Sequence, residues 1–360
     1  MSRLAGRLSS QSRDRLEALS TAPQADPKVR ESWKYNPVNR SLALLSDVDV
    51  AGPSAISGLD QRGVSFIENV QPDEAEIATL LSQSVNSPPS ARALLLAESV
   101  DRLIVNDRLA LPLRITRTDA RHPLLITVSP QSEVVIEELA ETSATGWICL
   151  HVRDGAMVSY NRLRSERASS EWQRLVMKLE RDARLHLNHY ATGSTLRRLD
   201  ALIELAGAGA ELDLQSAWTA AAREKIDQQW HVEHTAPQTT SRQVHHGIAD
   251  GNATTTFRGR IFIGTDCRQA NADLINRNLA LSAGATCNTK PELEIHNDDV
   301  RCSHGATVGQ LSDDSVFYFR SRGVSPNTAR RLLAAGFIRS TLRGSLSAGA
   351  RLALTGTADE

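Results

Sequence analysis

The sequence predicts a mainly β protein, a right-handed parallel β-helix flanked by helical regions at its N- and C-terminal ends. Two patterns in the middle of the chain support this prediction. Residues 92–314 hold many short runs in which apolar and polar side chains alternate, as they do in half-buried strands. Among these runs, hexads of the form small-Ala-x-apolar-x-apolar place Ala156, Ala183 and Ala210 at equal intervals along the chain.

The 27-residue interval indicates a solenoid, in which each turn of the chain buries its apolar face against the next turn. We therefore expect a parallel β-helix core over residues 92–314, with three short strands in each turn. Ala156, Ala183 and Ala210 should then stack at equivalent positions of successive turns.

Residues 1–91 are predicted to form an N-terminal helical region in which short helices are joined by irregular links. Leucine-spaced segments alternate there with prolines, which interrupt helices. Pro72 and the acidic residues directly after it are typical of a helix start. We expect Trp33 and Tyr35 to pack this region against its neighbour.

Residues 315–360 are predicted to form a C-terminal helical region. Ser325 is a suitable N-cap, Pro326 suits the first helical position, and Gly336 should end the helix. From 315 to 357 the chain contains seven arginines and no acidic residue. Two interpretations of this basic end stay open: a solvated helix face with a frayed tail, or a docking element for an acidic groove on a partner.

Composition limits the classes of function. The net charge of −1 provides no global field that would attract nucleic acid or an anionic membrane. The four cysteines form no C-x-x-C pair, which argues against a zinc module or a disulfide framework and favours the reducing cytoplasm. No apolar run approaches the ~20 residues of a membrane span. The arginine-rich first residues have a feature of transit peptides, but we expect an ordinary N-terminal helix there.

The sequence also lacks the motifs of several enzyme classes. It contains no phosphate-binding G-x-x-x-x-G-K-[ST] loop, no G-x-S-x-G, no H-E-x-x-H and no G-x-G-x-x-G. We therefore expect a protein that is not an enzyme and does not hydrolyse ATP itself. The pair His245-His246 has no carboxylate or thiol at metal-ligand spacing, so we interpret it as a structural or solvated loop.

Cys302 and His304 lie in the stretch with the most distinctive chemistry. Between Pro291 and Val308, polar residues alternate with apolar or small ones, which predicts strands and tight turns. Because residues two apart on a strand face the same way, the thiol and the imidazole should lie side by side. Such a pair suits a soft metal. The alternative is a small buried thiol and a histidine satisfied within a turn.

Three runs around this pair carry a family resemblance: KPELEI at 290–295, DDVRCSHGATVGQL at 298–311 and FYFRSRG at 317–323. They resemble the C-terminal signature of the SufB/SufD family, the scaffold proteins of the SUF iron–sulfur cluster assembly system. GTDCRQ at 264–269 is similar too, although many family members carry glycine in place of Cys267. The likeness is dense from 257 to 338 and weaker at ESWKY, residues 31–35.

This resemblance implies a scaffold that pairs through its β-helix with a SufB-type paralogue and binds SufC-type ABC ATPases through its C-terminal helices. ATP-driven movement of the ATPases would rearrange the paired β-helices and expose a buried assembly site. Cys302 and His304 match the family's thiol and imidazole at that interface, where they are tentative metal ligands shared with the partner. We expect no stably bound cofactor, only a transient iron–sulfur cluster. The expected ATPase-docking residues are Arg330, Leu332, Leu333 and Phe337.

Two other functions stay open. A β-helix carbohydrate-active enzyme would need acidic residues that converge in an open groove, and Asp298-Asp299 and Asp313-Asp314 are the candidates. A dimeric interaction module without a cluster role, including a homodimer, is the third hypothesis. Co-purification of partners from the native host would distinguish the three.

Overall fold

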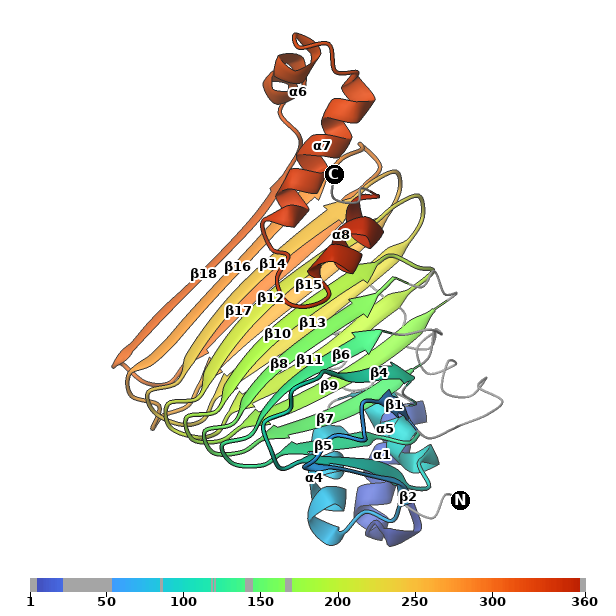
Figure 1. Cartoon of the computed structure of the whole chain (residues 1–360), viewed down its shortest axis with the longest axis vertical. Coiled ribbons are helices and arrows are strands. Elements are labelled where there is room, and N and C mark those ends of the chain that lie inside the picture. Colours follow the sequence, from blue (N-terminus) through green and yellow to red (C-terminus); the bar gives the residue numbers. More distant parts are fainter. Residues whose placement is uncertain are drawn as a thin grey trace.

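The computed structural model describes residues 5–21, 54–84, 87–117, 119, 121–139, 145–165 and 170–356. Trp33 and Tyr35, the expected packing anchors, lie outside these residues. The described part of the chain forms a solenoid of two sheets with helices at both ends (Figure 1), which confirms the predicted fold class. No helix in these ranges is long and apolar enough to cross a membrane.

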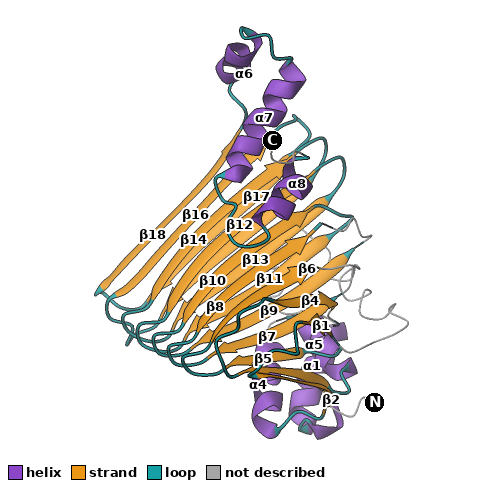
Figure 2. Cartoon of the chain, in the orientation of Figure 1, coloured by secondary structure: helices purple, strands orange, loops and turns teal. Residues whose placement is uncertain are grey.

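Two nine-stranded sheets form the walls of the solenoid (Figure 2). Sheet A contains, in spatial order, β1 (Ala55–Ser57), β4 (Leu113–Arg117), β6 (Glu133–Leu139), β8 (Met157–Arg164), β10 (Arg184–Thr192), β12 (Glu211–Ala220), β14 (Thr240–Ala249), β16 (Ala270–Ala280) and β18 (Val300–Gly309). Sheet B contains β17 (Thr286–Ile295), β15 (Thr254–Ile263), β13 (Lys225–His234), β11 (Arg197–Leu205), β9 (Glu171–Leu179), β7 (Gly146–Val152), β5 (Leu124–Val128), β3 (Val100–Val105) and β2 (Val64–Val70). All neighbouring strands are parallel, except that β1–β4 and β2–β3 are antiparallel.

Each turn contributes one long strand to each sheet, so the expectation of three short strands per turn is wrong. The register pairs Arg184 with Glu211, which lies one full repeat interval further along the chain. Within that turn, β10 and β11 hold nine residues each. Only about a third of the turn is left for its two corners, which is too little for a third strand.

Ala156, Ala183 and Ala210 occupy equivalent positions of successive turns, as predicted. Each is fully buried and directly precedes a strand of sheet A. The amide of Arg184 donates to the carbonyl of Ala156, and the amide of Glu211 donates to the carbonyl of Ala183, both at 2.9 Å. A small side chain at this corner lets the turns stack closely, which explains the repeated alanine.

The N-terminal end of the solenoid is covered by η1 (Ala5–Arg7), α1 (Ser10–Thr21), α4 (Glu74–Ser84) and α5 (Pro88–Leu96). Helices α1, α4 and α5 contribute to a separate apolar cluster that includes Trp147 and Trp172. The helix predicted after Pro72 is α4, which starts in a capping box: Asp73 and Glu76 exchange two hydrogen bonds of 2.8 Å. However, residues 1–91 also contain β1 and β2, and α5 crosses the expected boundary, so this region is not purely helical.

Three helices follow the last strand: α6 (Asp313–Arg320), α7 (Pro326–Arg339) and α8 (Ser347–Thr355). Ser325 caps α7, as predicted, because its Oγ accepts a hydrogen bond from the Thr328 amide at 3.2 Å. Gly336 does not end α7, which continues to Arg339. Glycine inside a helix costs about 1 kcal/mol relative to alanine, and burial of Ile338 beyond it offsets this cost.

Candidate functional site

The C-terminal end of the solenoid is open. β18 and β17 are the outermost strands of sheets A and B, and no other described strand pairs with their outer edges. Apolar side chains of this last turn are exposed, including Ile295 (41%) and Val308 (50%). The N-terminal edges, by contrast, end in short antiparallel strands next to helices. A long edge with unpaired N–H and C=O groups is a template for another strand.

The structure places Cys302 and His304 on β18, at this open end, with both side chains on the inward face. In the register of sheet A, Cys302 lies beside Ala272 and His304 beside Leu274, and both neighbours belong to the buried core. The two side chains thus extend columns of core residues. His304 is exposed and Cys302 half-buried because no further turn covers them.

A thiol and an imidazole, the two groups of this pair, are side chains that can bind metals. Burial raises the pKa of the Cys302 thiol, and a backbone hydrogen bond with Ala272 opposes this effect. At neutral pH the group is therefore a thiol, which loses its proton when a metal binds. Thiolate and imidazole are ligands of soft and borderline metals. The described residues contain no cluster of three or more His, Cys, Asp or Glu that could hold a metal ion.

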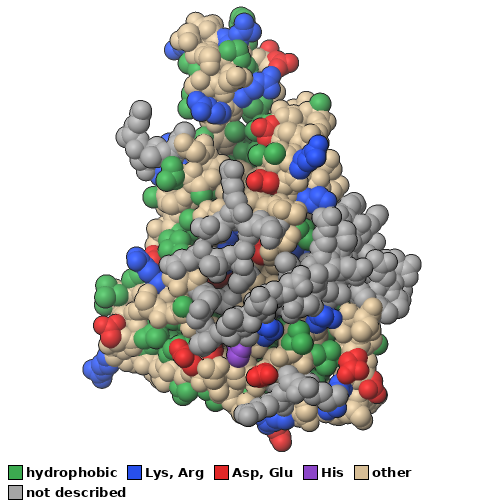
Figure 3. Space-filling model, turned by 90° about the vertical axis from the view of Figure 1, so that its right-hand side faces the viewer, with side chains coloured by type: hydrophobic (Ala, Val, Ile, Leu, Met, Phe, Trp, Pro, Cys, Tyr) green, Lys and Arg blue, Asp and Glu red, His purple; other side chains and the backbone are tan. Residues whose placement is uncertain are grey.

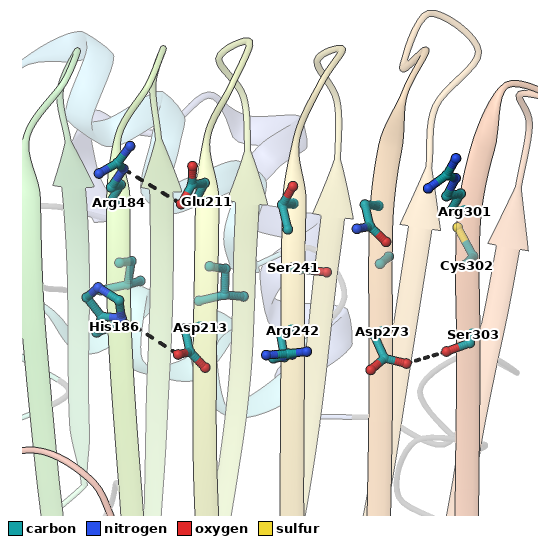
Figure 4. A pocket seen from close by; sticks show the side chains of 15 residues that line it. Arg184, His186, Glu211, Asp213, Ser241, Arg242, Asp273, Arg301, Cys302 and Ser303 are labelled. Atoms are coloured by element: carbon teal, nitrogen blue, oxygen red, sulfur yellow. Dashed lines mark hydrogen bonds and ion pairs between the residues drawn. The ribbon is translucent and has the colours of Figure 1, made fainter.

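A groove of about 680 Å³ crosses the outer face of sheet A and reaches β18 (Figure 4). One row of its lining is in register across five strands: His186, Asp213, Arg242, Asp273 and Ser303. His186 Nδ1 lies 3.8 Å from the Asp213 carboxylate, and its interaction with this carboxylate raises the pKa of His186. Ser303 donates a hydrogen bond to Asp273. Basic and acidic side chains therefore alternate along this row, and the hydroxyl of Ser303 is its last member, on the outermost strand.

Except for Cys302, the groove residues were missed from the sequence. A signal was present, because the hexads at 182–187 and 209–214 carry opposite charges at equivalent positions. Arg184 lies 3.7 Å from Glu211 in the structure. The later turns are longer than the repeat interval of the alanines, since Glu211 pairs with Thr240 of the next turn. Only the observed register could place Arg242 and Asp273 in the same row.

Helices α6 and α7 project beyond the solenoid, whereas α8 lies on sheet A (Figure 1). Of the residues expected to dock an ATPase, Arg330 and Leu332 are exposed on α7. Leu333 and Phe337 are half-buried, and Phe337 stacks on His246 of β14 with 4.4 Å between the ring centroids. The four residues therefore do not form one exposed face.

Helix α6 adds two aromatic residues that are not among the expected docking residues. Phe317 and Tyr318 are 67 and 56% exposed, although large aromatic side chains are usually buried. The Arg322 guanidinium lies 4.9 Å from the Tyr318 ring centroid. Figure 3 shows basic and hydrophobic side chains together on these projecting helices. A mixed surface of this kind is typical of a protein interface.

His245 and His246 do not form a loop, contrary to the expectation, but lie on β14. His245 is inside the solenoid, where burial lowers its pKa to about 3, and its Nδ1 lies 2.8 Å from Ser216 Oγ. Cys267 is also buried, and its thiol donates to the His234 carbonyl at 3.0 Å. His245 and Cys267 are thus buried and form hydrogen bonds within the protein, which indicates a structural role.

Comparison with known proteins agrees with this architecture. The family model described as SUF system FeS cluster assembly, SufBD core domain, matches residues 116–337. The chain belongs to this SufBD family. A SufBD family protein of Synechocystis is 46% identical over 101 residues, 28% of this chain and 22% of the relative.

Two further relatives are more distant but match over longer segments. SufD of Escherichia coli is 32% identical over 159 residues, 44% of this chain and 38% of the relative. The chloroplastic protein ABCI7 of Arabidopsis thaliana is 31% identical over 188 residues, 52% of this chain and 40% of the relative. The matches thus span less than half the length of these SufBD relatives. The family is described by iron–sulfur cluster assembly in the SUF system, and this member has a mainly β solenoid.

Proposed function

We propose that this chain is a non-catalytic scaffold subunit of a cytoplasmic SUF-type complex, paired with a SufB-type paralogue and bound to SufC-type ABC ATPases. The observation that carries the proposal is the open end of the solenoid, where two unpaired sheet edges lie beside Cys302 and His304. The iron–sulfur cluster is the product that the complex assembles and releases.

Strand addition explains how the paralogue would bind. Backbone groups along the outer edges of β17 and β18 are available to a partner strand, and main-chain hydrogen bonds would supply affinity. A second solenoid pairing with both edges would also bury Ile295 and Val308, which are now exposed. The inward faces of the two solenoids would then meet, so that Cys302 and His304 lie at the seam between subunits.

Cys302 and His304 would supply two of the ligands for a cluster at this seam. Sulfur and nitrogen ligands both occur in iron–sulfur centres. Two residues do not complete a site, so the paralogue would contribute the others and the cluster would be held only transiently. Because the Cys302 thiol must lose its proton, cluster binding should weaken as the pH falls.

The projecting helices α6 and α7 would bind the ATPase. Arg330 and Leu332 of α7 and Phe317 and Tyr318 of α6 offer exposed positive and apolar groups. An acidic, partly apolar groove on the ATPase would complement them. Since the chain lacks a phosphate-binding loop, ATP hydrolysis would occur in the partner.

The alternative of a carbohydrate-active enzyme gains no support from the geometry. Asp313 and Asp314 lie in the first turn of α6, where carboxylates stabilise the helix end. Asp298 and Asp299 line an adjoining groove with Arg301. The two acidic pairs therefore do not converge. A dimeric module without a cluster role would use the same open end, and the experiment below distinguishes it.

Co-purification from the native host, followed by mass spectrometry, tests the proposal. We expect a SufB-type paralogue and a SufC-type ATPase in the complex. Substitution of Val308 by proline on the β18 edge should remove the paralogue and retain the ATPase, because proline removes an edge hydrogen-bond donor. Leu332→Asp should do the opposite. Recovery of this chain with only a second copy of itself would favour the dimeric module.

A further inference from the structure

Two side chains on one row of sheet A, Tyr190 and His246, make polar contacts with the C-terminal segment. Tyr190, Ala217 and His246 are neighbours in register on β10, β12 and β14. The Arg343 amide donates to Tyr190 Oη at 2.6 Å, and Tyr190 Oη donates to the Arg343 carbonyl at 2.9 Å. His246 Nδ1 donates to the Phe337 carbonyl at 3.0 Å, and the two rings stack.

The chain between these contacts is packed closely against the sheet. The small residue Ala217 lies between the larger Tyr190 and His246, and Ile338 and Leu342 join it in one apolar cluster. Gly344 has φ +74, and a Cβ there would come within 1.8 Å of Asn161 Oδ1. Only glycine can adopt this conformation at this distance from the sheet. The segment therefore has little freedom to move independently.

The same row leads to the open end of the solenoid. His246 is in register with Arg277 of β16, and Arg277 is in register with Thr307 of β18. Thr307 lies three residues from His304 on the same strand. Most of α6 and α7 extends beyond the sheet (Figure 1). A force applied to these helices by a bound protein is therefore passed to sheet A through residues 337–343, which contact the sheet.

We propose that Tyr190 and His246, together with residues 337–343, form a rigid joint that transmits movement of a protein bound to α6 and α7 to sheet A. Both side chains form hydrogen bonds with backbone atoms of the C-terminal segment. These bonds therefore do not depend on the rotamer of any side chain in that segment. A displacement of α7 then rotates the sheet instead of bending the connection. The inference rests on the proposed function only for the identity of the bound protein, and Tyr190 and His246 are positioning residues.

The isolated chain provides the first test, which is independent of any assembly activity. Spin labels attached through non-cysteine chemistry at Arg331 of α7 and Arg242 of β14, both exposed, report the distance between helix and sheet. We expect a narrow distance distribution in the wild type and a broad one in the double variant Tyr190→Phe/His246→Ala. A broad wild-type distribution, or a narrow one in the double variant, would overturn the joint.

The reconstituted complex with the paralogue and the ATPase provides the second test. The double variant should bind the ATPase with a dissociation constant within about twofold of wild type and assemble clusters about tenfold more slowly. Asn in place of Ala at position 246 of the double variant supplies an amide N–H in place of the Nδ1 donor and should restore part of the rate. Arg223→Ala, at an exposed corner between β12 and β13, should change nothing. An unchanged assembly rate in the double variant would refute transmission through this joint. If the wild-type complex makes no cluster, the proposed function fails while the distance measurement still decides whether the joint is rigid.

Discussion

Cys302 and His304 lie at the open end of the solenoid, whereas Cys149 and His245 lie on strands further inside it. Burial raises the pKa of Cys149 to about 12 and lowers that of His245 to about 3, which holds both groups neutral at physiological pH. Cys302 is only half-buried and His304 is exposed. Metal chemistry by thiol and imidazole is therefore expected at the open end and not in the core.

Substitution of His304 by alanine tests this assignment. Because the side chain is exposed, we expect the free energy of unfolding to change by less than about 0.5 kcal/mol. Cluster assembly by the reconstituted complex should nevertheless be lost. Ser303→Ala, on the outward face of the same strand, is the matched control and should retain assembly. Normal activity of a Cys302→Ala/His304→Ala double variant would remove the pair from the mechanism.

Buried histidines should make the fold sensitive to acid. Burial lowers the pKa of His234 to about 4, that of His245 to about 3 and that of His189 well below its usual value. These groups stay neutral in the folded chain but take up protons in the unfolded chain below about pH 6.5. Their contribution to stability is thus fully present above pH 6.5 and is lost as the pH falls.

Denaturant unfolding between pH 7.5 and 5 measures this effect. In that window each such histidine should reduce the free energy of unfolding by about 1.4 kcal/mol per pH unit below its unfolded pKa. His245→Gln should make the free energy of unfolding depend less steeply on pH, because one of these histidines has been removed. A free energy of unfolding that is constant over this range would contradict the assignment of buried neutral histidines.

For single elements of the fold, the corner that precedes each strand of sheet A is the most constrained position. Ala183 is fully buried between its equivalents in the adjacent turns, Ala156 and Ala210. Ala183→Leu should overpack this corner and lower the free energy of unfolding by about 1–3 kcal/mol. Arg184→Ala, at the exposed neighbouring position, should cost much less. Equal effects in equilibrium unfolding would argue against close stacking at the corners.

Helix α7 has two functions in our account, and single substitutions can separate them. Arg330→Glu and Leu332→Ala alter its exposed face and should weaken ATPase binding at least tenfold, measured by calorimetry. Neither should change thermal unfolding, because neither side chain is buried. Unchanged affinity in both variants would exclude this face as the docking surface.

The sequence predicted the solenoid and its stacked alanines because the repeat interval is a property of the chain itself. It did not predict two strands per turn, because an interval does not show how residues divide between strands and corners. His246 was misinterpreted because the helix that covers it is distant in the sequence, with the Phe337 carbonyl accepting a hydrogen bond from its Nδ1. The functional role of Cys302 and His304 stays a prediction, although the structure brings them to the open end.

At the scale of the whole molecule, the N-terminal end of the solenoid is covered and the C-terminal end is open. Helices cover the N-terminal end, and an apolar cluster seals it. The C-terminal end presents two long edges that no described strand pairs with, and the projecting helices lie beside it (Figure 1). Natural proteins usually block such edges to prevent aggregation. An edge left open in both sheets at once is consistent with a permanent partner, such as the SufB-type paralogue that we propose.

Amide hydrogen exchange of the chain with and without the SufB-type paralogue tests the central claim most directly. If the open end is the pairing surface, amides of β17 and β18 should exchange much more slowly in the complex, because new main-chain hydrogen bonds form along both edges. Amides of β1 and β2, at the opposite end, should be unaffected. Protection confined to any other part of the molecule, with β17 and β18 unchanged, would contradict the account.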